Sequence, residues 1–428
     1  MKSATFGSRL GRFGLLAAMA VSLIVLGASS AWATISHQSA CDNEESELQG
    51  KRIGSCSPAT GEGGIGELTN RNPVRQNIDQ LNGYFGSLNV GGPVEAFQRQ
   101  TKRDSGNAGT ALAMFLDRQN GADLIAGYTP RETTGEFIQR WLQPLRDHNV
   151  NAWSNIAWSS PRDTHRPTRY DSDIWTLTVG ADMPILDDAL IVGVFGSYTH
   201  SDVDTSFNTG DVESKLGTVG PYFVYSLGDY LSFDTTVAGI FGQNENIIGS
   251  RTPGLRDARG EQDVDGFFVS MNANANYWVG NWGVQGRLGF LHSDTETESY
   301  DLGPEFRAFF APGTPSTTTR IGGTNNELTQ LSLAAQINHF YDKGLPFCED
   351  TKAMPFFRIT FNYDLDHDNI QLPFGVSQHP NDDDEVVLNW GVTLFGNGPF
   401  SGSVEAGRTF ARSRYEAWSV SGTLSYAF

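Results

Sequence analysis

Residues 415–428, YEAWSVSGTLSYAF, alternate between two kinds of side chain up to the last residue of the sequence. Because a β-strand directs successive side chains to opposite faces, the stretch divides into two sets. The first set is apolar with aromatic residues towards each end, and it comprises Trp418, Val420, Gly422, Leu424, Tyr426 and Phe428. From Ala417 onwards the second set contains only alanine, serine and threonine, so neither face is charged over residues 417–428. This pattern indicates a strand with one face towards lipid.

Similar strands recur from about residue 151 onwards. About twelve segments alternate in this way, each about ten residues long, which suits a tilted strand that crosses a bilayer. They are residues 152–159, 173–183, 189–199, 216–225, 230–242, 267–279, 282–292, 331–341, 357–365, 386–396, 400–408 and 418–428. Short turns at 227–229 and 280–281 alternate with long polar loops at 200–214, 243–265, 293–327 and 366–385. This alternation predicts an all-β fold, a closed antiparallel transmembrane β-barrel with brief periplasmic turns and extended outer loops.

The faces opposite the apolar sets carry polar and charged residues that a dry core could not hold without partners. We expect them to face a water-filled lumen, and the candidate lumen-facing residues are Asp234, Asn272, Asn274, Asn276, Arg287, Arg358 and Glu405.

The N-terminus indicates export. Basic residues precede an apolar segment at 13–28, which is short for a spanning helix, and Ala31-Trp32-Ala33 forms a small-x-small cleavage site. Residues 1–33 are therefore predicted to be a cleaved secretory signal peptide. The net charge of −19 disfavours nucleic acid as a partner. In an exported chain, Cys41 and Cys56 are candidates for a local disulfide, which leaves Cys348 as a free thiol.

The region between the signal peptide and the strands has a different pattern of apolar residues. Segments 74–85, 108–118 and 136–145 place apolar residues at helical spacing, so we expect a small, mostly helical or irregular region. The clearest is 136–145, where Thr133 and Glu136 form a capping box and Phe137, Trp141 and Leu142 share one face.

Residues 151–428 resemble the translocator (β) domain of autotransporters, the type V secretion family. The resemblance is carried by GVFGSYTHSD (193–202), GTVGPYFVYS (217–226) and the last 26 residues from Ser403. It implies a twelve-stranded barrel in the outer membrane of a Gram-negative bacterium. It also implies that barrel assembly machinery reads the terminal aromatic, so the candidate assembly signal is Trp418, Leu424, Tyr426 and Phe428. In this family a helix just before the barrel threads the pore, and 131–149 is the candidate for that helix. The family usually carries a large passenger, whereas the region before this barrel is short.

Two motifs raise the possibility of chemistry. His-Ser-Asp occurs at 200–202 and at 292–294, but adjacent residues of a strand point to opposite faces and cannot form a catalytic triad. Asp364, Asp366 and Asp368 are spaced like the start of a calcium loop, yet Asn369 stands where its glycine is required. We therefore expect that the protein is not an enzyme and that it has no metal site and no cofactor.

The sequence thus predicts four parts: a signal peptide at 1–33, a short passenger or plug at 34–130, a candidate pore helix at 131–149 and an autotransporter-type barrel at 150–428. The predicted function is an outer-membrane barrel that translocates or displays the short N-terminal region. The alternatives are a stand-alone or porin-like channel plugged by that region, and an outer-membrane hydrolase. The expected partners are outer-membrane lipid, lipopolysaccharide and the barrel assembly machinery, and the chain is expected to be monomeric.

Overall fold

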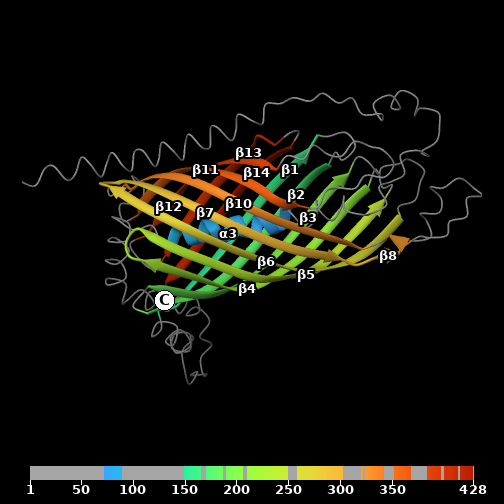
Figure 1. Cartoon of the computed structure of the whole chain (residues 1–428), viewed down its shortest axis with the longest axis horizontal. Coiled ribbons are helices and arrows are strands. Elements are labelled where there is room, and N and C mark those ends of the chain that lie inside the picture. Colours follow the sequence, from blue (N-terminus) through green and yellow to red (C-terminus); the bar gives the residue numbers. More distant parts are fainter. Residues whose placement is uncertain are drawn as a thin grey trace, which may run out of the picture.

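The computed structural model describes residues 72–88, 149–164, 170–186, 189–205, 210–248, 258–301, 320–321, 323–341, 351–367, 383–396, 400–412 and 415–427. Twelve long strands form one closed antiparallel barrel (Figure 1). In chain order they are β1 (Asn151–Asp163), β2 (Tyr170–Ile185), β3 (Leu190–Thr205), β4 (Gly210–Leu227), β5 (Leu231–Ile248), β6 (Ala258–Val279), β7 (Trp282–Thr297), β10 (Thr324–His339), β11 (Lys352–His367), β12 (Asp384–Phe395), β13 (Phe400–Phe410) and β14 (Tyr415–Ala427). The predicted fold class is confirmed. Two further strands, β8 (Tyr300–Asp301) and β9 (Arg320–Ile321), pair with each other outside the barrel.

The first and last strands close the barrel. β1 pairs with β14 from Asn151 opposite Ala427 to Asp163 opposite Tyr415, so the sheet has no edge left to satisfy in hydrocarbon. The start of β1 at Asn151 and the end of β14 at Ala427 both lie on the side of the barrel that carries the short turns. Gly228 and Gly280 adopt positive φ in two of these turns, which glycine does without steric cost.

Several strands are longer than the sequence pattern predicts. The expected loop at 243–265 is largely a continuation of the β5–β6 hairpin, in which Gln243 lies opposite Asp263 and Ile248 opposite Ala258. Strand pairing can continue beyond the membrane because it satisfies backbone groups in any solvent. Periodicity of apolar residues stops at the edge of the lipid, so the pattern marks the membrane-spanning part of a strand rather than its full length.

The outer surface of the barrel is apolar over its middle. Large hydrophobic side chains such as Leu177, Val194, Leu288, Val404 and Leu424 are exposed there. Charged residues follow further along the strands, towards the long loops. The described part of the chain contains no helix with both the length and the hydropathy of a membrane span.

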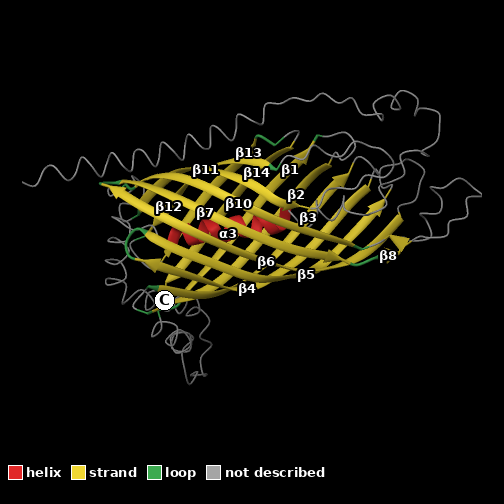
Figure 2. Cartoon of the chain, viewed as in Figure 1, coloured by secondary structure: helices red, strands yellow, loops and turns green. Residues whose placement is uncertain are grey.

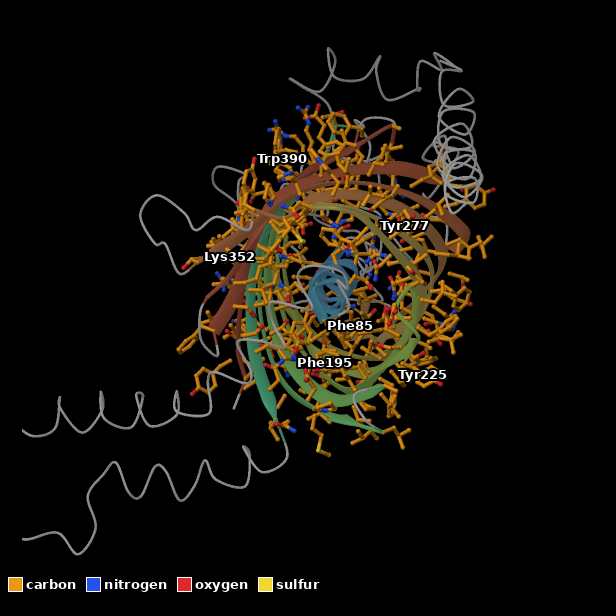
Figure 3. The ribbon with its side chains drawn as sticks, turned by 90° about the vertical axis from the view of Figure 1, so that its left-hand side faces the viewer. Phe85, Phe195, Tyr225, Tyr277, Lys352 and Trp390 are labelled. Carbon is orange, nitrogen blue, oxygen red and sulfur yellow. The ribbon has the colours of Figure 1, made fainter. Side chains whose placement is uncertain are left out.

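A single helix of the described residues, α3 (Asn72–Leu88), lies inside the barrel (Figure 2). The view along the barrel shows this helix surrounded by strands, with Phe85 and Phe195 on the inside and Tyr225 and Trp390 on the outside (Figure 3). The helix packs against β1, β2 and β3, and a core of buried residues forms at that contact. The lumen is therefore not simply a water-filled pore.

Candidate functional site

The candidate site is the lumen of the barrel together with α3. Asn72 and Pro73 are typical residues for the start of a helix, where an amide cap and a residue without an N–H group fit best. Apolar side chains then recur at helical spacing, and all of them are buried: Val74, Ile78, Leu81, Tyr84 and Phe85. This stripe gives the helix one face that needs an apolar partner.

The wall of the lumen supplies that partner. The Tyr84 ring stacks on Trp153 of β1 with 4.3 Å between centroids, and Phe85 lies 5.0 Å from Tyr222 of β4. The buried apolar cluster continues across the inner face of the sheet through Phe195, Val224, Ala238, Ile240, Phe268, Leu291 and Leu328. One side of the lumen is thus apolar, which explains how an amphipathic helix can bind there.

Hydrogen bonds fix the C-terminal part of α3 in a buried cluster that we call the inner-end network: Tyr84, Asn151, Trp153, Asp182 and Tyr222. The hydroxyls of Tyr84 and Tyr222 both donate to Asp182 Oδ2, at 2.5 and 2.6 Å. Asn151 donates to the Tyr84 hydroxyl at 2.5 Å, and Trp153 Nε1 donates to the Tyr222 hydroxyl at 2.8 Å. A buried carboxylate is stabilised when several donors surround it, so the network holds the helix through one shared acceptor.

Glycines make room for the two large rings of this network. A Cβ atom on Gly193 would lie 2.2 Å from the Tyr222 ring, and one on Gly180 would lie 2.5 Å from the Trp153 ring. Both glycines face into the lumen from strands next to the ring they accommodate. The inner-end network therefore depends on glycine at these two positions as well as on its polar groups.

The rest of α3 is held by amide side chains. Gln80 donates to the backbone carbonyl of Thr176 at 3.4 Å and accepts a hydrogen bond from Thr178. Asn77 donates to Thr199 at 3.4 Å, and Gln76 accepts from Ser159 at 3.2 Å. Polar side chains that lie between the apolar residues of α3 thus also bind the helix to the barrel wall.

At its first residue the helix reaches the end of the barrel with the long loops. Asn72 Nδ2 donates to the Tyr170 hydroxyl and the Tyr415 hydroxyl donates to Asn72 Oδ1, both at 3.5 Å. Tyr170 and Tyr415 begin β2 and β14 at that end. The helix therefore runs from the long-loop end to the short-turn end.

The opposite side of the lumen is charged and open. Arg75 of α3 forms an ion pair with Glu385, which also lies 3.7 Å from Arg412. Between the helix and β11–β14 there is a cavity of about 140 Å³. Its lining includes polar groups from both sides, so the cavity can hold water.

The structure places the seven candidate lumen-facing residues as follows. Asp234 accepts hydrogen bonds from Asn272 at 2.6 Å and from Asn274 at 2.7 Å, and Asn272 also donates to Asn82 of α3 at 3.0 Å. Arg358 forms an ion pair with Glu405, and both line the large cavity. Asn276 and Arg287 line a smaller pocket beside the helix.

The candidate assembly signal is only partly described. Trp418 and Leu424 are exposed on the outer face of β14, and Tyr426 packs edge-on against Phe400 with 4.8 Å between centroids. Phe428 lies outside the described residues, as do Cys41, Cys56 and Cys348.

The candidate pore helix at 131–149 also lies outside the described residues, apart from Asn149. The helix seen in the lumen is α3, which contains the helical segment predicted at 74–85. The sequence predicts residues 34–130 to be a passenger or a plug, but it does not single out 74–85 as the helix in the lumen, and the inner-end network was missed. One signal was available, since Asp182 is an acidic residue on the lumen side of a strand near its inner end.

Both His-Ser-Asp motifs are split between the two faces of the sheet. Ser201 and Ser293 are buried, whereas Asp202 and His200 lie on the outer side with exposed side-chain surface. The three residue types do not meet at one site. The residues spaced like a calcium loop, 364–369, do not begin in a loop. Asp364 is buried in β11, where its carboxylate accepts a hydrogen bond from Gln330 at 2.6 Å.

Comparisons with known proteins agree with this architecture. Residues 152–407 match the family described as the autotransporter β-domain. The barrel is similar to the β-domain of the Bordetella autotransporter BrkA, with 15% identity and a TM-score of 0.50 over 65% of this chain and 100% of that one. It is also similar to the translocator domain of the autotransporter NalP from Neisseria meningitidis, with 12% identity and a TM-score of 0.50 over 68% and 95% of the two chains. No match was found among curated protein sequences.

Proposed function

Since the chain belongs to the autotransporter family and its barrel lies in the bacterial outer membrane, we propose that α3 is the trailing part of a segment that passes through the lumen to the cell surface. In this proposal the residues before α3 are displayed outside the cell. The residues between α3 and β1 stay in the periplasm.

The direction of α3 carries the proposal. Its first residue contacts Tyr170 and Tyr415 at the long-loop end, and Tyr84 contacts Asn151 at the short-turn end. Short turns are periplasmic in outer-membrane barrels and long loops are extracellular. A chain that leaves α3 towards its N-terminus therefore emerges at the outer surface.

The same geometry supports a periplasmic location for residues 89–148. This segment starts at the inner end of α3 and returns to Asn149 at the start of β1, so both of its ends lie at the short-turn end. The barrel unit itself is non-enzymatic, and an activity would have to reside in the displayed residues. Lipid and lipopolysaccharide around the barrel, and the assembly machinery during insertion, are the partners that this proposal requires.

A plug inside a stand-alone channel is the second candidate, because α3 fills the apolar side of the lumen and leaves a cavity of about 140 Å³ on the other side. The two functions differ in the fate of the residues before α3. A plug requires only α3 itself, whereas display requires residues 34–71 to be accessible from outside.

Protease treatment of intact cells separates the two functions. One epitope tag is inserted next to Cys56 and a matched tag next to Ala108, in separate chains that both keep α3. We expect protease to remove the Cys56 tag and to spare the Ala108 tag until the outer membrane is permeabilised. Protection of both tags would contradict display, and loss of both in intact cells would contradict the periplasmic location of 89–148.

A further inference from the structure

The two His-Ser-Asp motifs share a feature that only the strand register reveals. In the first copy Asp202 of β3 lies directly opposite Glu213 of β4. In the second copy Asp294 of β7 lies directly opposite Glu327 of β10. The serine of each copy is buried, so each motif presents a histidine and an aspartate on the outer surface beside a glutamate from the next strand.

Both copies lie at the same height on the barrel. His200 comes ten residues after Leu190, which begins β3, and His292 comes ten residues after Trp282, which begins β7. Ten residues of tilted strand span about 25 Å, which is about the height of the apolar band of an outer-membrane barrel. The histidines therefore lie at the outer edge of the membrane, where water and ions have access.

The first copy brings metal-ligating atoms together. His200 Nε2 lies 3.2 Å from Asp202 Oδ2, and His200 Nδ1 lies 3.9 Å from Glu213 Oε1. One ligand atom from each of the three side chains falls within 4.8 Å of the other two. Ligand atoms of a tetrahedral zinc site are about 3.3 Å apart, given bond lengths of about 2.0 Å. Small rotations of these three side chains, of which Asp202 is exposed and His200 and Glu213 are half-buried, are enough to reach that spacing.

The electrostatic setting favours a bound cation. Asp202 and Glu213 belong to a row of directly opposed acidic residues that continues over five strands, and the row comprises Asp173, Asp202, Glu213, Glu245 and Glu261. Like charges directly opposite each other destabilise a sheet. Lys215 and Arg259 contact this row, at 2.7 Å from Glu213 and 3.0 Å from Glu245. These two monovalent side chains are fewer than the five carboxylates.

We propose that His200, Asp202 and Glu213 bind a divalent transition-metal ion, with Zn²⁺ as the best fit, on the outer surface of the barrel. Imidazole nitrogen distinguishes such ions from magnesium and calcium, which prefer oxygen ligands alone. The ion links β3 to β4 at the membrane edge and neutralises the opposed carboxylates. Three protein ligands leave a fourth position of a tetrahedral ion open to solvent.

Two neighbouring residues make the proposal specific. Lys215 lies directly opposite His200 and contacts Glu213, so its ammonium group competes with the metal for that carboxylate. In the second copy His292 Nδ1 lies 3.0 Å from the Thr329 hydroxyl and 3.8 Å from Glu327. Within the described residues, only the first copy brings three ligand atoms within 4.8 Å of one another. The second copy is therefore a natural control.

The test is calorimetric titration of the mature chain in detergent micelles with Zn²⁺, after alkylation of its cysteines. Millimolar magnesium is present throughout to occupy carboxylates that bind any divalent cation. We expect one Zn²⁺ per chain, and binding at least about tenfold weaker in the variants H200A and E213Q. K215Q should bind more tightly than the unchanged chain, and H292A should bind equally well.

Co²⁺ absorption gives a second readout, because a nitrogen and oxygen ligand set produces a visible band that depends on His200. The heat-dependent gel migration of each variant shows that its barrel is folded. The proposal would be overturned if the unchanged chain did not bind Zn²⁺. Equal binding by a folded H200A variant would overturn it as well.

Discussion

The apolar contact between α3 and the barrel wall can be weakened without touching the barrel. The variant L81A/F85A removes two side chains that are 2% and 5% exposed. Truncation of a buried leucine to alanine costs about 2–5 kcal/mol, and that of a buried phenylalanine about 3–5 kcal/mol. The two residues are neighbours on one helix face and their costs do not add fully, so we take about 4 kcal/mol as a lower value for the pair. Because about 1.4 kcal/mol is a tenfold change, the ratio of docked to undocked α3 should fall by about a thousandfold.

Single-channel recording in planar bilayers measures this change. An α-helix with its side chains is about 10–12 Å wide, so undocking it opens a water-filled path through a twelve-stranded barrel. We expect the unchanged chain to show a small, steady conductance through the cavity beside α3. The L81A/F85A variant should show openings several-fold larger, and it should spend more time in them.

A matched control lies on the same helix. Gly86 is exposed, and a Cβ atom at this position would meet nothing within 4 Å. The substitution G86A should produce none of the larger openings, because alanine favours the helix by about 1 kcal/mol and removes no contact. If folded L81A/F85A barrels conduct like the unchanged chain, the apolar contact does not keep α3 in the lumen and the reasoning is refuted.

Three other predictions concern the barrel. The variant G220A should lower the free energy of unfolding by about 1–3 kcal/mol in urea titrations, because its Cβ would lie 2.1 Å from the Val237 carbonyl oxygen. A Cβ atom in G239A, on the facing strand, would meet nothing within 4 Å, so this variant should be as stable as the unchanged chain. Equal stability of the two variants would contradict this account. Deletion of Phe428 should reduce the amount of barrel in the outer membrane without reducing export across the inner membrane, as measured by fractionation, and unchanged outer-membrane levels would remove its role in assembly. An unboiled sample should migrate differently from a boiled one on a denaturing gel, since all strands of a closed barrel are paired, and identical migration of membrane-inserted protein would count against that closure.

The alternation of side chains was sufficient to predict the barrel. In β14 one set of residues is apolar and the other is small, and the exposed Trp418, Val420 and Leu424 are the members of the first set. A period of two depends only on the local geometry of a strand, so it can be recognised without knowledge of the neighbouring strands. The even number of strands and the alternation of short and long connections are also properties of the sequence, and from them follow the closed barrel and the location of its ends.

Which side chains and which helix occupy the lumen could not be predicted, because this depends on contacts between residues far apart in the sequence. In β4 both sets are apolar near the turn, and only the closed barrel distinguishes the buried Tyr222 and Val224 from the exposed Phe223 and Tyr225. Residue type therefore indicated a polar lumen, although one side of it is apolar. For the same reason the sequence did not identify which helical segment fits there. Tyr84 reaches Asp182 across 98 positions of the chain, and no local pattern joins the two.

The outer metal-ligand cluster shows the same division between sequence and tertiary structure. The sequence contains His200, Asp202 and Glu213, and the alternation assigns the first two to one face of a strand. Whether Glu213 joins them depends on the register of β3 against β4, in which Asp202 lies opposite Glu213. A shift of one residue would turn every side chain of a strand to the other face, and it is excluded because one face of the sheet is buried against lipid and the other faces the lumen. Periodicity thus determined which residues share a face, while closure of the barrel decided which faces meet.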